Sequence, residues 1–592
     1  MSSKKLSVST TAESVPASQY ESVSPRTAYP PPGALNFNKR SCMTRLIDGF
    51  RPHPALYERE HTHVRKFGGN YDVEVANFNV AGSPLARKLK GRHLQMIAIG
   101  GSIGSGLFVG AGTALATGGP GALLLAYFLM GTMLYCTVHA LGELSIMFPI
   151  AGSFAVYSSR LMDPAWGFAM GWNYAISWLI TIPLEVVAAT IALQFWGTTL
   201  PIALWVAIFW MVIIGLNMFG VKGYGEGEFI FSIIKVIAVI SFIILGIILN
   251  IGGGPSGSYL GGKFWHSPGA FANGFKGLCN VFANAAFSFS GAELVGMAAA
   301  ETANPRKSLP SAIKQVFWRI TLFYIVSLSL VGVIVPYDDP RLFGESSVDV
   351  RASPFVIAIL NAGIKILPDV MNVVILVAVL SVGNSAVFGA SRTLVSLAEQ
   401  GQAPKMFAYV DRKGRPLVGI AAAALFGLLS FVGIGSPKIQ SDVFTWLLAT
   451  CGLSVIFTWT SVCICHIRFR KAWKLHGHST RELAFTSQAG VTGSWIGLVL
   501  NVLVMCTQLW ISISPLGKRP SPVTFFSTYL CVPIVLLCFA VYKVWFRTKW
   551  VRLEDIDLVT GRRELDLAAL LADEREERAS WPAWKRVYKV FC

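Results

Sequence analysis

Residues 94–116, LQMIAIGGSIGSGLFVGAGTALA, form an apolar stretch that is interrupted near its middle by glycine and serine. The hydrocarbon core of a bilayer is about 30 Å thick, so roughly 20 apolar residues can cross it as a helix. The glycines of GGSIGSG, residues 100–106, lose the most entropy in a helix and permit non-helical backbone. Unwound backbone is tolerated at membrane depth only where it lines a polar site inside the protein. The stretch therefore predicts a broken membrane helix beside such a site.

A second apolar run, residues 276–300, is interrupted in the same manner by FSFSG at 287–291. The two breaks lie five predicted spans apart, at corresponding positions of two halves of the chain. Such a pair is the best sequence indication of the substrate site of a transporter. For the first helix alone, glycines spaced as G-x-x-x-G are equally well explained as contacts for close helix packing. The second break favours the binding interpretation.

The two breaks offer backbone groups of opposite polarity. A half-helix that begins at Gly104 directs free N–H groups and the positive end of its dipole toward an anion. Unpaired carbonyls near Ile103, Phe287 and Ser290 suit an ammonium group. A ligand that carries both charges is a zwitterion, so we expect an α-amino acid.

The composition agrees with a membrane protein. Of the 592 residues, 53% are hydrophobic and 14% are charged, and the mean hydropathy is +0.55. Soluble domains average about 25% charged residues, so a soluble enzyme is excluded, and so is a wholly disordered chain. No nucleophile–base motif or metal-ligand set stands out, so we expect neither an enzyme nor a bound cofactor. A net charge of +18 could indicate nucleic-acid binding, but the chain has no aromatic-basic module or zinc-finger spacing.

Runs of membrane-crossing length predict an all-α, polytopic protein with twelve transmembrane helices in residues 94–546. Residues 1–93 are polar and rich in serine and proline, which predicts a largely disordered N-terminal tail, and residues 547–592 form a C-terminal tail. The twelve expected spans are 94–116, 121–144, 166–196, 201–220, 228–250, 276–300, 315–336, 370–391, 417–435, 443–466, 490–511 and 523–546.

The distribution of basic residues predicts the orientation. With an even number of spans, both tails lie on one side of the membrane. Lysine and arginine are more frequent in the loops on that side than in the opposite loops. Because basic residues accumulate in cytoplasmic loops, we expect both termini in the cytoplasm. The excess positive charge is then a topology signal, and membrane lipid rather than nucleic acid surrounds the protein.

Three ionisable residues lie deep within predicted spans: Glu185, Lys235 and Glu293. Charges at such depth are costly and mark functional sites by default. A buried amine or carboxyl group can exchange a proton during a transport cycle, and we favour this role for Lys235. The alternative is a structural lysine–glutamate pair that never changes charge. For Glu185 and Glu293 the two interpretations are balanced.

With these residues identified, the sequence resembles fungal amino acid permeases of the amino acid–polyamine–organocation superfamily, and most of all the general amino acid permeases. The resemblance covers about residues 85–592. It implies a leucine-transporter-type fold of two inverted five-helix repeats plus two helices. It also implies import of L-amino acids with protons as the coupling ion at the plasma membrane, with an endosomal pool as a second location. The matching segments are 92–108 (RHLQMIAIGGSIGSGLF), 286–320, 399–417 (EQGQAPKMFAYVDRKGRPL) and 465–472 (CHIRFRKA).

The resemblance also implies site residues. Lys235 matches a lysine that replaces a sodium ion in related transporters and takes part in proton coupling, while Glu185 and Ser177 match positions linked to transport and side-chain selection. The resemblance places the substrate carboxylate at the backbone of Gly104, Ser105 and Gly106. It places the ammonium group at the carbonyls of Ile103, Phe287 and Ser290. Ser288 is included as part of the second break.

Substrate range depends on the tenth span, WLLATCG at 446–452. Ala449 and Cys451 resemble the broad-range or neutral group of permeases, whereas basic-amino-acid permeases have a more polar pattern there. The alternative is that these two small residues only allow close helix packing. Trp178 and Trp446 are given less weight than Phe287, because most such aromatic side chains simply pack between helices.

Other functions remain as alternatives. An amino acid sensor of the same fold would bind amino acids without moving them, and a permease of narrower range would transport fewer of them. The tails resemble regulatory tails, in which Lys4 and Lys5 would accept ubiquitin from ubiquitin-ligase machinery and Cys592 would be acylated. The C-terminus lacks the C-a-a-X context that prenylation requires.

Overall fold

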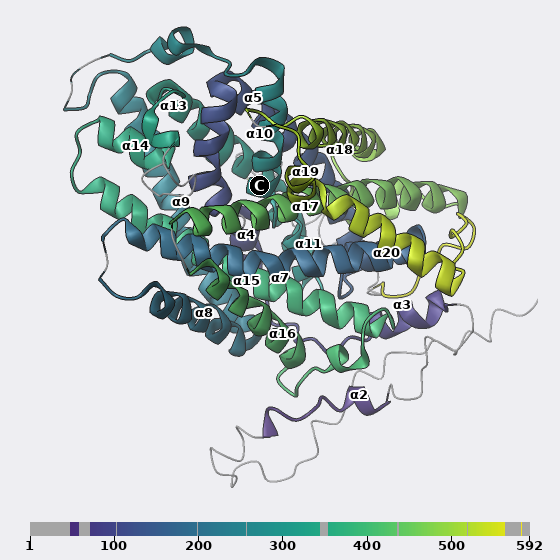
Figure 1. The fold of residues 1–592 in the computed structure, drawn as a ribbon. Coiled ribbons are helices and arrows are strands. Elements are labelled where there is room, and N and C mark those ends of the chain that lie inside the picture. Colours follow the sequence, from purple (N-terminus) through teal and green to yellow (C-terminus); the bar gives the residue numbers. More distant parts are fainter. Residues whose placement is uncertain are drawn as a thin grey trace, which may run out of the picture. The chain divides into compact units, whose positions relative to one another are not determined.

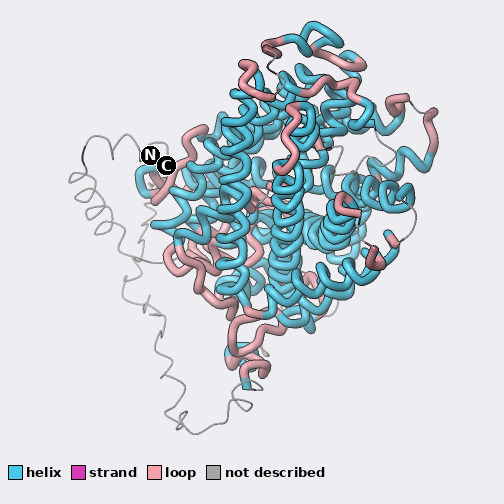
Figure 2. Tube along the Cα trace, turned by 90° about the vertical axis from the view of Figure 1, so that its left-hand side faces the viewer, coloured by secondary structure: helices cyan, strands magenta, loops and turns pink. Residues whose placement is uncertain are grey.

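The computed structural model is helical almost throughout (Figure 2). It describes residues 48–58, 71–101, 103–197, 199–255, 257, 259–343, 353–434, 437–517, 519–562 and 582. Within these residues there is no β-strand, only two isolated bridges. Residues 52–592 form one compact unit that contains all the helices named here.

Figure 1 shows the arrangement of the helices. The first half of the chain contains α2 (Ala55–Glu58), α3 (Val73–Ala81), α4 (Gly91–Gly100), the π-helix η2 (Gly106–Gly110), α5 (Ala111–Met147), α6 (Phe154–Leu161), α7 (Pro164–Gln194), α8 (Ile202–Met218), α9 (Gly220–Asn250), η3 (Trp265–Gly269), α10 (Gly274–Phe289) and α11 (Leu294–Ala298). The second half contains α12 (Pro305–Trp318), the π-helix η4 (Arg319–Val326), α13 (Ser327–Ile334), η5 (Pro340–Phe343), α14 (Pro354–Asn361), α15 (Leu367–Glu399), η7 (Lys405–Ala408), α16 (Leu417–Gly427), η8 (Leu428–Gly433), α17 (Pro437–Leu475), η9 (Thr480–Glu482), α18 (Gly490–Ile513), α19 (Pro522–Tyr529) and α20 (Cys531–Phe546).

Eight helical segments in the described residues are long and apolar enough to cross a membrane, which confirms an all-α, polytopic membrane protein. They are Gly106–Met147, Pro164–Gln194, Gly220–Asn250, Gly274–Ala298, Pro305–Ile334, Leu367–Glu399, Trp446–Leu475 and Gly490–Ile513. Three shorter apolar helices, Ile202–Met218, Leu417–Val432 and Cys531–Phe546, fall where spans four, nine and twelve are expected.

Both predicted helix breaks are present. The first membrane helix stops at the end of α4, Gly100, and helical structure resumes at Gly106. The second break separates α10, which ends at Phe289, from α11, and Gly291 has a positive φ of 92° within it. Only glycine adopts this left-handed region without a steric cost, so the position suits the residue found there. A further non-helical residue, Gly119, interrupts the segment Gly106–Met147 with φ 79° and ψ 170°.

The broken helices pack at the centre of the bundle. α4 lies against α9, α10 lies against α5, and the long helices α7 and α15 run along each other (Figure 1). Toward the outside, α9, α18 and α20 expose large apolar side chains, including Ile237, Leu503 and Leu537. Exposed apolar side chains on helices of this length are expected where lipid is the solvent.

Residues 71–93, which the sequence analysis placed in the N-terminal tail, are folded against one end of the bundle. α3 begins after Asp72, whose carboxylate accepts hydrogen bonds from two N–H groups of the first helical turn. The hydroxyl group of Tyr71 donates a hydrogen bond to the carbonyl oxygen of Gln400, beyond the end of α15, at 3.0 Å. The folded part of the chain therefore includes residues from the predicted tail.

Residues 547–562 follow α20 and return along the same end. The backbone N–H of Val551 donates to the carbonyl of Met162 at 2.8 Å. The buried guanidinium group of Arg160, in α6, donates to the carbonyl of Asp557 at 2.5 Å and pairs with its carboxylate at 3.0 Å. The end of the bundle that carries α3 and residues 547–562 is called the tail side.

Candidate functional site

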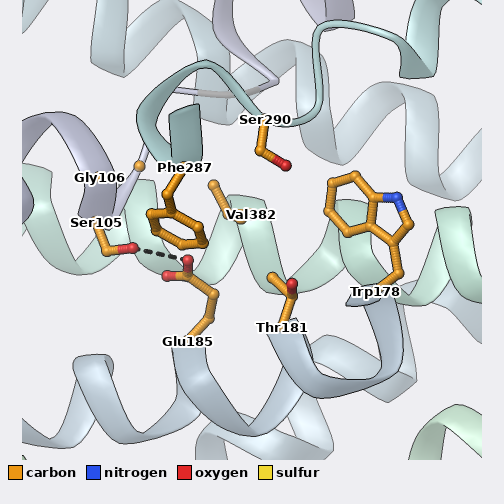
Figure 3. Close-up of a pocket in the computed structure, with 9 residues that line it drawn as sticks. Ser105, Gly106, Trp178, Thr181, Glu185, Phe287, Ser290 and Val382 are labelled. Carbon is orange, nitrogen blue, oxygen red and sulfur yellow. Dashed lines mark hydrogen bonds between the residues drawn. The ribbon is translucent and has the colours of Figure 1, made fainter. Parts of the chain in front are cut away.

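A small pocket lies where the two helix breaks meet α7 and α15 (Figure 3). The space between its side chains is about 260 Å³ and is partly open to solvent, so it is a hollow and not an enclosed cavity. The residues that line it come from four segments far apart in the sequence: Gly104, Ser105, Gly106, Trp178, Thr181, Glu185, Phe287, Ser290 and Val382.

The first break contributes backbone to the pocket because glycine allows close approach. A Cβ atom built on Gly106 would lie 2.6 Å from the Cα atom of Ser288, on the second broken helix. A Cβ atom on Gly104 would lie 2.4 Å from a methyl group of Val382 in α15. A larger residue at Gly106 would meet backbone and push the second broken helix away, whereas at Gly104 the side chain of Val382 would have to move. The contact between the two breaks therefore depends on glycine.

The second break contributes the ring of Phe287 and the hydroxyl group of Ser290, both of which border the pocket (Figure 3). The backbone N–H of Ser290 donates to the carbonyls of Ala286 and Phe287, each at 3.1 Å. A carbonyl oxygen has two lone pairs, so the Phe287 carbonyl retains capacity for a second donor.

α7 presents one polar face to the pocket. Trp178, Thr181 and Glu185 are spaced three and four residues apart, which places them on the same side of a helix. Their side chains converge on the pocket from α7 (Figure 3). The hydroxyl group of Ser105 donates to Oε1 of Glu185 at 2.8 Å, joining α7 to the first break. The other carboxylate oxygen, Oε2, has no hydrogen-bond partner among the described residues.

Lys235 lies in α9, outside the pocket lining, and is fully buried. Its ammonium group donates to the carbonyl of Gly100 at 2.5 Å, where the first half-helix ends. It also donates to the hydroxyl of Ser381 at 2.8 Å and lies 3.5 Å from Oε1 of Glu228. A cation at the C-terminal end of a helix is favoured by the helix dipole. Lys235 therefore holds the end of α4 and does not pair with Glu185.

Glu293 is fully buried just after the second break, and both of its oxygens have partners. Oε1 accepts hydrogen bonds from the hydroxyl of Tyr174 at 3.3 Å and from the N–H of Gly291 at 3.2 Å. Oε2 accepts one from the indole N–H of Trp459 at 3.2 Å. The carboxylate thus connects the second break to α7 and α17, and it does not border the pocket.

The other predicted site residues surround the pocket without lining it. Ser288 shares its hydroxyl with Tyr127 at 2.8 Å and so faces away from the pocket. Ser177 and Cys451 lie behind Thr181, because the Cys451 thiol is 3.5 Å from both the Ser177 carbonyl and the Thr181 hydroxyl. Ile103 is buried in the first break.

Several predicted residues have no structural outcome. The side chain of Ala449 lies outside the described residues, and so do Lys4, Lys5 and Cys592 in the tails. Trp446 is 55% exposed, whereas Trp178, given little weight in the sequence analysis, lines the pocket.

Glu228, Thr181 and Val382 were not predicted as site residues from the sequence. Glu228 stands at the predicted start of the fifth span and could be taken for a residue of the membrane boundary. Its position seven residues before Lys235 was the available signal, since residues seven apart lie on the same face of a helix. Thr181 and Val382 have ordinary membrane-helix side chains, so only the position of the pocket distinguishes them.

The sequence was compared with protein-family models and with known proteins. A family model described as amino acid permease matches residues 93–554. The general amino-acid permease GAP2 of Candida albicans is 58% identical over 527 residues, which cover 88% of this chain and 89% of that protein. The general amino-acid permease GAP1 of Saccharomyces cerevisiae is 54% identical over 532 residues, 88% of each chain. The S-adenosylmethionine permease GAP4 of Candida albicans is 50% identical over 525 residues, 88% of this chain and 86% of that one.

Proposed function

The chain belongs to the amino acid permease family, and from this premise we propose that it imports L-amino acids together with protons across the plasma membrane. The family is one of transporters rather than enzymes, and the resemblance to general amino acid permeases noted in the sequence is confirmed. The observation that carries the proposal is the pocket between the two helix breaks, which combines backbone polar groups with a carboxylate that is only half hydrogen-bonded.

The pocket has the polarity that a zwitterion needs. The helix that restarts at Gly106 begins at the pocket, where the N–H groups of Leu107 and Phe108 already donate to the carbonyl of Gly104. The N–H groups of Gly104, Ser105 and Gly106 would bind the carboxylate of the substrate. The carbonyls of Ile103, Phe287 and Ser290 would accept hydrogen bonds from its ammonium group. The side chain of the substrate would then extend toward Trp178 and Thr181 on α7.

Proton coupling is proposed for Glu185 and Lys235. Glu185 bonds Ser105, at the end of the first break, and Lys235 bonds Gly100, where the helix before the break ends. Glu185 touches the break through Ser105 and faces the pocket, so its protonation would respond to a bound ammonium group. Lys235 holds the carbonyl of Gly100, so loss of its proton would weaken the contact that fixes α4. Proton movement and substrate binding would thus act on one flexible segment. Glu293, with three donors, is better suited to hold the second break than to carry a proton.

We also propose twelve spans arranged as two inverted five-helix repeats plus two helices. The eight long helical segments and three shorter ones give eleven candidates among the described residues. The segment Gly106–Met147 is too long for one crossing, and counting it as two supports twelve. Its 42 residues would extend about 63 Å as a straight helix, twice the bilayer core, and it turns at Gly119. With twelve spans, the excess of basic residues in the tail-side loops would place both termini in the cytoplasm. Lys4 and Lys5 would there be open to ubiquitin ligases.

A broad substrate range is proposed from the names of the relatives and from the small side chains behind the pocket. Two of the similar proteins are general amino-acid permeases, but another of comparable identity is an S-adenosylmethionine permease. Cys451 supports Thr181 from behind, and a small residue at this position leaves room for side chains of different sizes. Ala449, two residues before it, is proposed to act in the same way.

Uptake of a panel of radiolabelled L-amino acids in permease-deficient cells tests the proposal. We expect saturable uptake of several amino acids, abolished by a protonophore, and alkalinisation of the medium when unlabelled substrate is added. Cells that carry an empty vector provide the background.

Each outcome separates one alternative. Binding of amino acids by purified protein without uptake would indicate a sensor. Uptake that is insensitive to the protonophore would refute proton symport. Uptake of a single amino acid, with no competition from the others in the panel, would replace the broad range with a narrow one.

A further inference from the structure

A chain of polar side chains that are absent from the pocket lining leads away from Lys235. The ammonium group donates to Ser381 Oγ at 2.8 Å, and this hydroxyl donates to Oε1 of Glu228 at 2.7 Å. The hydroxyl of Ser385 donates to Oε2 of Glu228 at 3.4 Å and lies 3.2 Å from the hydroxyl of Tyr224. All five side chains are fully buried. Buried polar groups of a membrane helix are costly and mark a pathway by default.

The chain is built on two facing helices. In α9, Tyr224, Glu228 and Lys235 are four and seven residues apart and so share one face. In α15, Ser381 and Ser385 are four residues apart and complete the contacts between them. Lys235 and Tyr224 are separated by eleven residues, or about 16 Å along α9. The chain therefore covers about half of the bilayer core.

The Tyr224 end of the chain lies at the tail side, near water. α9 starts just before it, and Arg415 donates to the carbonyl of Met218 at this helix start. Gly414, next to Arg415, packs closely against Ala86 in the segment before α4, because a Cβ atom on Gly414 would lie 2.5 Å from that of Ala86. The start of α9 is thereby connected to the tail side. In the first turns of α9, Lys222 is exposed, and Glu226 has a side chain that is 38% exposed.

The other charged groups around Lys235 do not offer a competing route. Arg319, from η4, is fully buried and donates to the carbonyl of Ala98 at 2.8 Å, two residues before the carbonyl that Lys235 holds. Its guanidinium group acts on Lys235 only through its charge, as does Glu185 of α7. Arginine keeps its proton in proteins, so Arg319 holds the helix end and cannot accept a proton.

We propose that Glu228, Ser385 and Tyr224 carry the coupled proton from Lys235 to the tail side, a route that rests on the proposed proton symport. Lys235 releases a proton to the Ser381 hydroxyl, which passes its own proton to Oε2 of Glu228 at 2.9 Å, and this leaves a neutral amine and a carboxylic acid protonated on Oε2. The acid gives a proton from Oε2 to Ser385, whose own proton passes to Tyr224. The hydroxyl of Tyr224 releases its proton to water at the tail side as the bundle opens there. Every O–H or N–H bond that breaks is matched by one that forms.

Two variants interrupt this route with little change in shape. Tyr224→Phe removes one hydroxyl but keeps the ring, which stacks on Phe388 with 4.1 Å between centroids. Ser385→Ala removes the preceding hydroxyl. Tyr157→Phe is the matched control, since Tyr157 is also fully buried and donates to the carbonyl of Phe148 at 2.6 Å, outside the route.

The full-length protein is reconstituted in liposomes with a labelled amino acid that the cells take up. Two rates are measured: net uptake driven by an inward proton gradient, and exchange of labelled for unlabelled amino acid at equal pH. Exchange returns the proton to the side it came from and does not need the route. For Tyr224→Phe and Ser385→Ala we expect net uptake to fall about 100-fold while exchange stays at the wild-type rate. Tyr157→Phe should retain both rates.

The outcomes separate this route from the function on which it rests. If both rates stay at the wild-type level in the two variants, or fall together, the route is wrong and the hydroxyls have at most a structural role. If net uptake by the wild-type protein brings no protons into the liposomes, the proposed symport itself is wrong.

Discussion

Glu185 and Glu293 are both buried carboxylates beside a helix break, yet their surroundings differ. Glu185, which lines the pocket, receives a hydrogen bond from Ser105 on one oxygen, and its other oxygen has no partner among the described residues. Glu293 accepts three hydrogen bonds, from Tyr174, Trp459 and a backbone N–H, and lies behind the pocket. Burial alone therefore does not identify the acid that works in transport.

The difference indicates two kinds of task. A carboxylate with an unused oxygen can gain or lose a proton without breaking existing hydrogen bonds. One with three donors loses charge-assisted bonds whenever it is protonated, and such bonds contribute about 1.5–3 kcal/mol each. We infer that Glu185 takes part in the transport cycle and that Glu293 fixes the shape of the second break.

Replacing Gly106 should have the largest effect, because this residue holds the two breaks together. The Cβ atom of Gly106→Ala would lie 2.6 Å from backbone of the second broken helix, so the breaks must separate. Misplacement by about 1 Å can reduce a positioned reaction about 100-fold. We expect substrate binding and uptake both to fall by more than about 100-fold, measured as binding to purified protein and uptake in cells.

Gly110→Ala is the matched control on the same helix. A Cβ atom there would approach only the carbonyl oxygen of Ser105, at 3.9 Å, which is an ordinary contact. This variant should bind and transport at close to the wild-type level. If Gly106→Ala behaves in the same way, the close contact of the two breaks is not needed for binding.

Glu185→Gln tests the acid that faces the pocket. The amide has the same shape and can still accept a hydrogen bond from Ser105, but it cannot exchange a proton. We expect net proton-driven uptake to fall about 100-fold, as for removal of a general acid or base, while exchange and substrate binding are largely retained. Equal loss of net uptake and exchange would instead assign Glu185 a purely binding or structural role.

Glu293→Gln should have a smaller effect of a different kind. The amide nitrogen cannot accept hydrogen bonds, so at least one of the three donors loses its partner. A loss of about 1.5 kcal/mol corresponds to roughly tenfold weaker substrate binding, and net uptake and exchange should decline together. Parallel measurement of the two rates checks this. Selective loss of net uptake would show that Glu293, too, carries the proton, and the contrast with Glu185 would disappear.

Composition, spacing and resemblance were enough to predict helical spans, both breaks and three buried charges. They could not distinguish Glu185 from Glu293, because the partners Ser105, Tyr174 and Trp459 are 80 or more residues away in the chain. The folding of residues 71–93 was also missed, since a polar segment predicts disorder unless its contacts with the bundle are known. These failures share one cause: the missing information lies in contacts between distant segments.

Asp557 is a third carboxylate to compare with Glu185 and Glu293, but it lies outside the predicted spans. We expect its replacement to leave the transport rates unchanged. It pairs with Arg160 at 3.0 Å and accepts hydrogen bonds from the N–H groups of Val559 and Thr560, each at 2.9 Å. Burial raises the pKa of Asp557, but the charge of Arg160 and these hydrogen bonds outweigh it, so the pKa lies below the usual range. A lowered pKa means that the ionised group stabilises the fold above about pH 4 and that this stabilisation is lost as the pH falls through the lower, folded-state value.

Asp557→Asn should therefore loosen the segment 547–562 at neutral pH and make little difference in acid. A loss of about 1.4 kcal/mol would speed local opening tenfold, and the amide hydrogen of Val551, bonded to Met162, reports that opening by hydrogen exchange. We expect the ratio of the exchange rates of variant and wild type to be about ten at pH 7 and to approach one below pH 4. A ratio of one at pH 7 would mean that the ion pair does not hold this segment. Transport is measured on the same variant. If its net uptake falls while its substrate exchange is unchanged, a fully hydrogen-bonded carboxylate far from the pocket also takes part in proton coupling. The number of hydrogen bonds would then no longer distinguish Glu185 from the other acids.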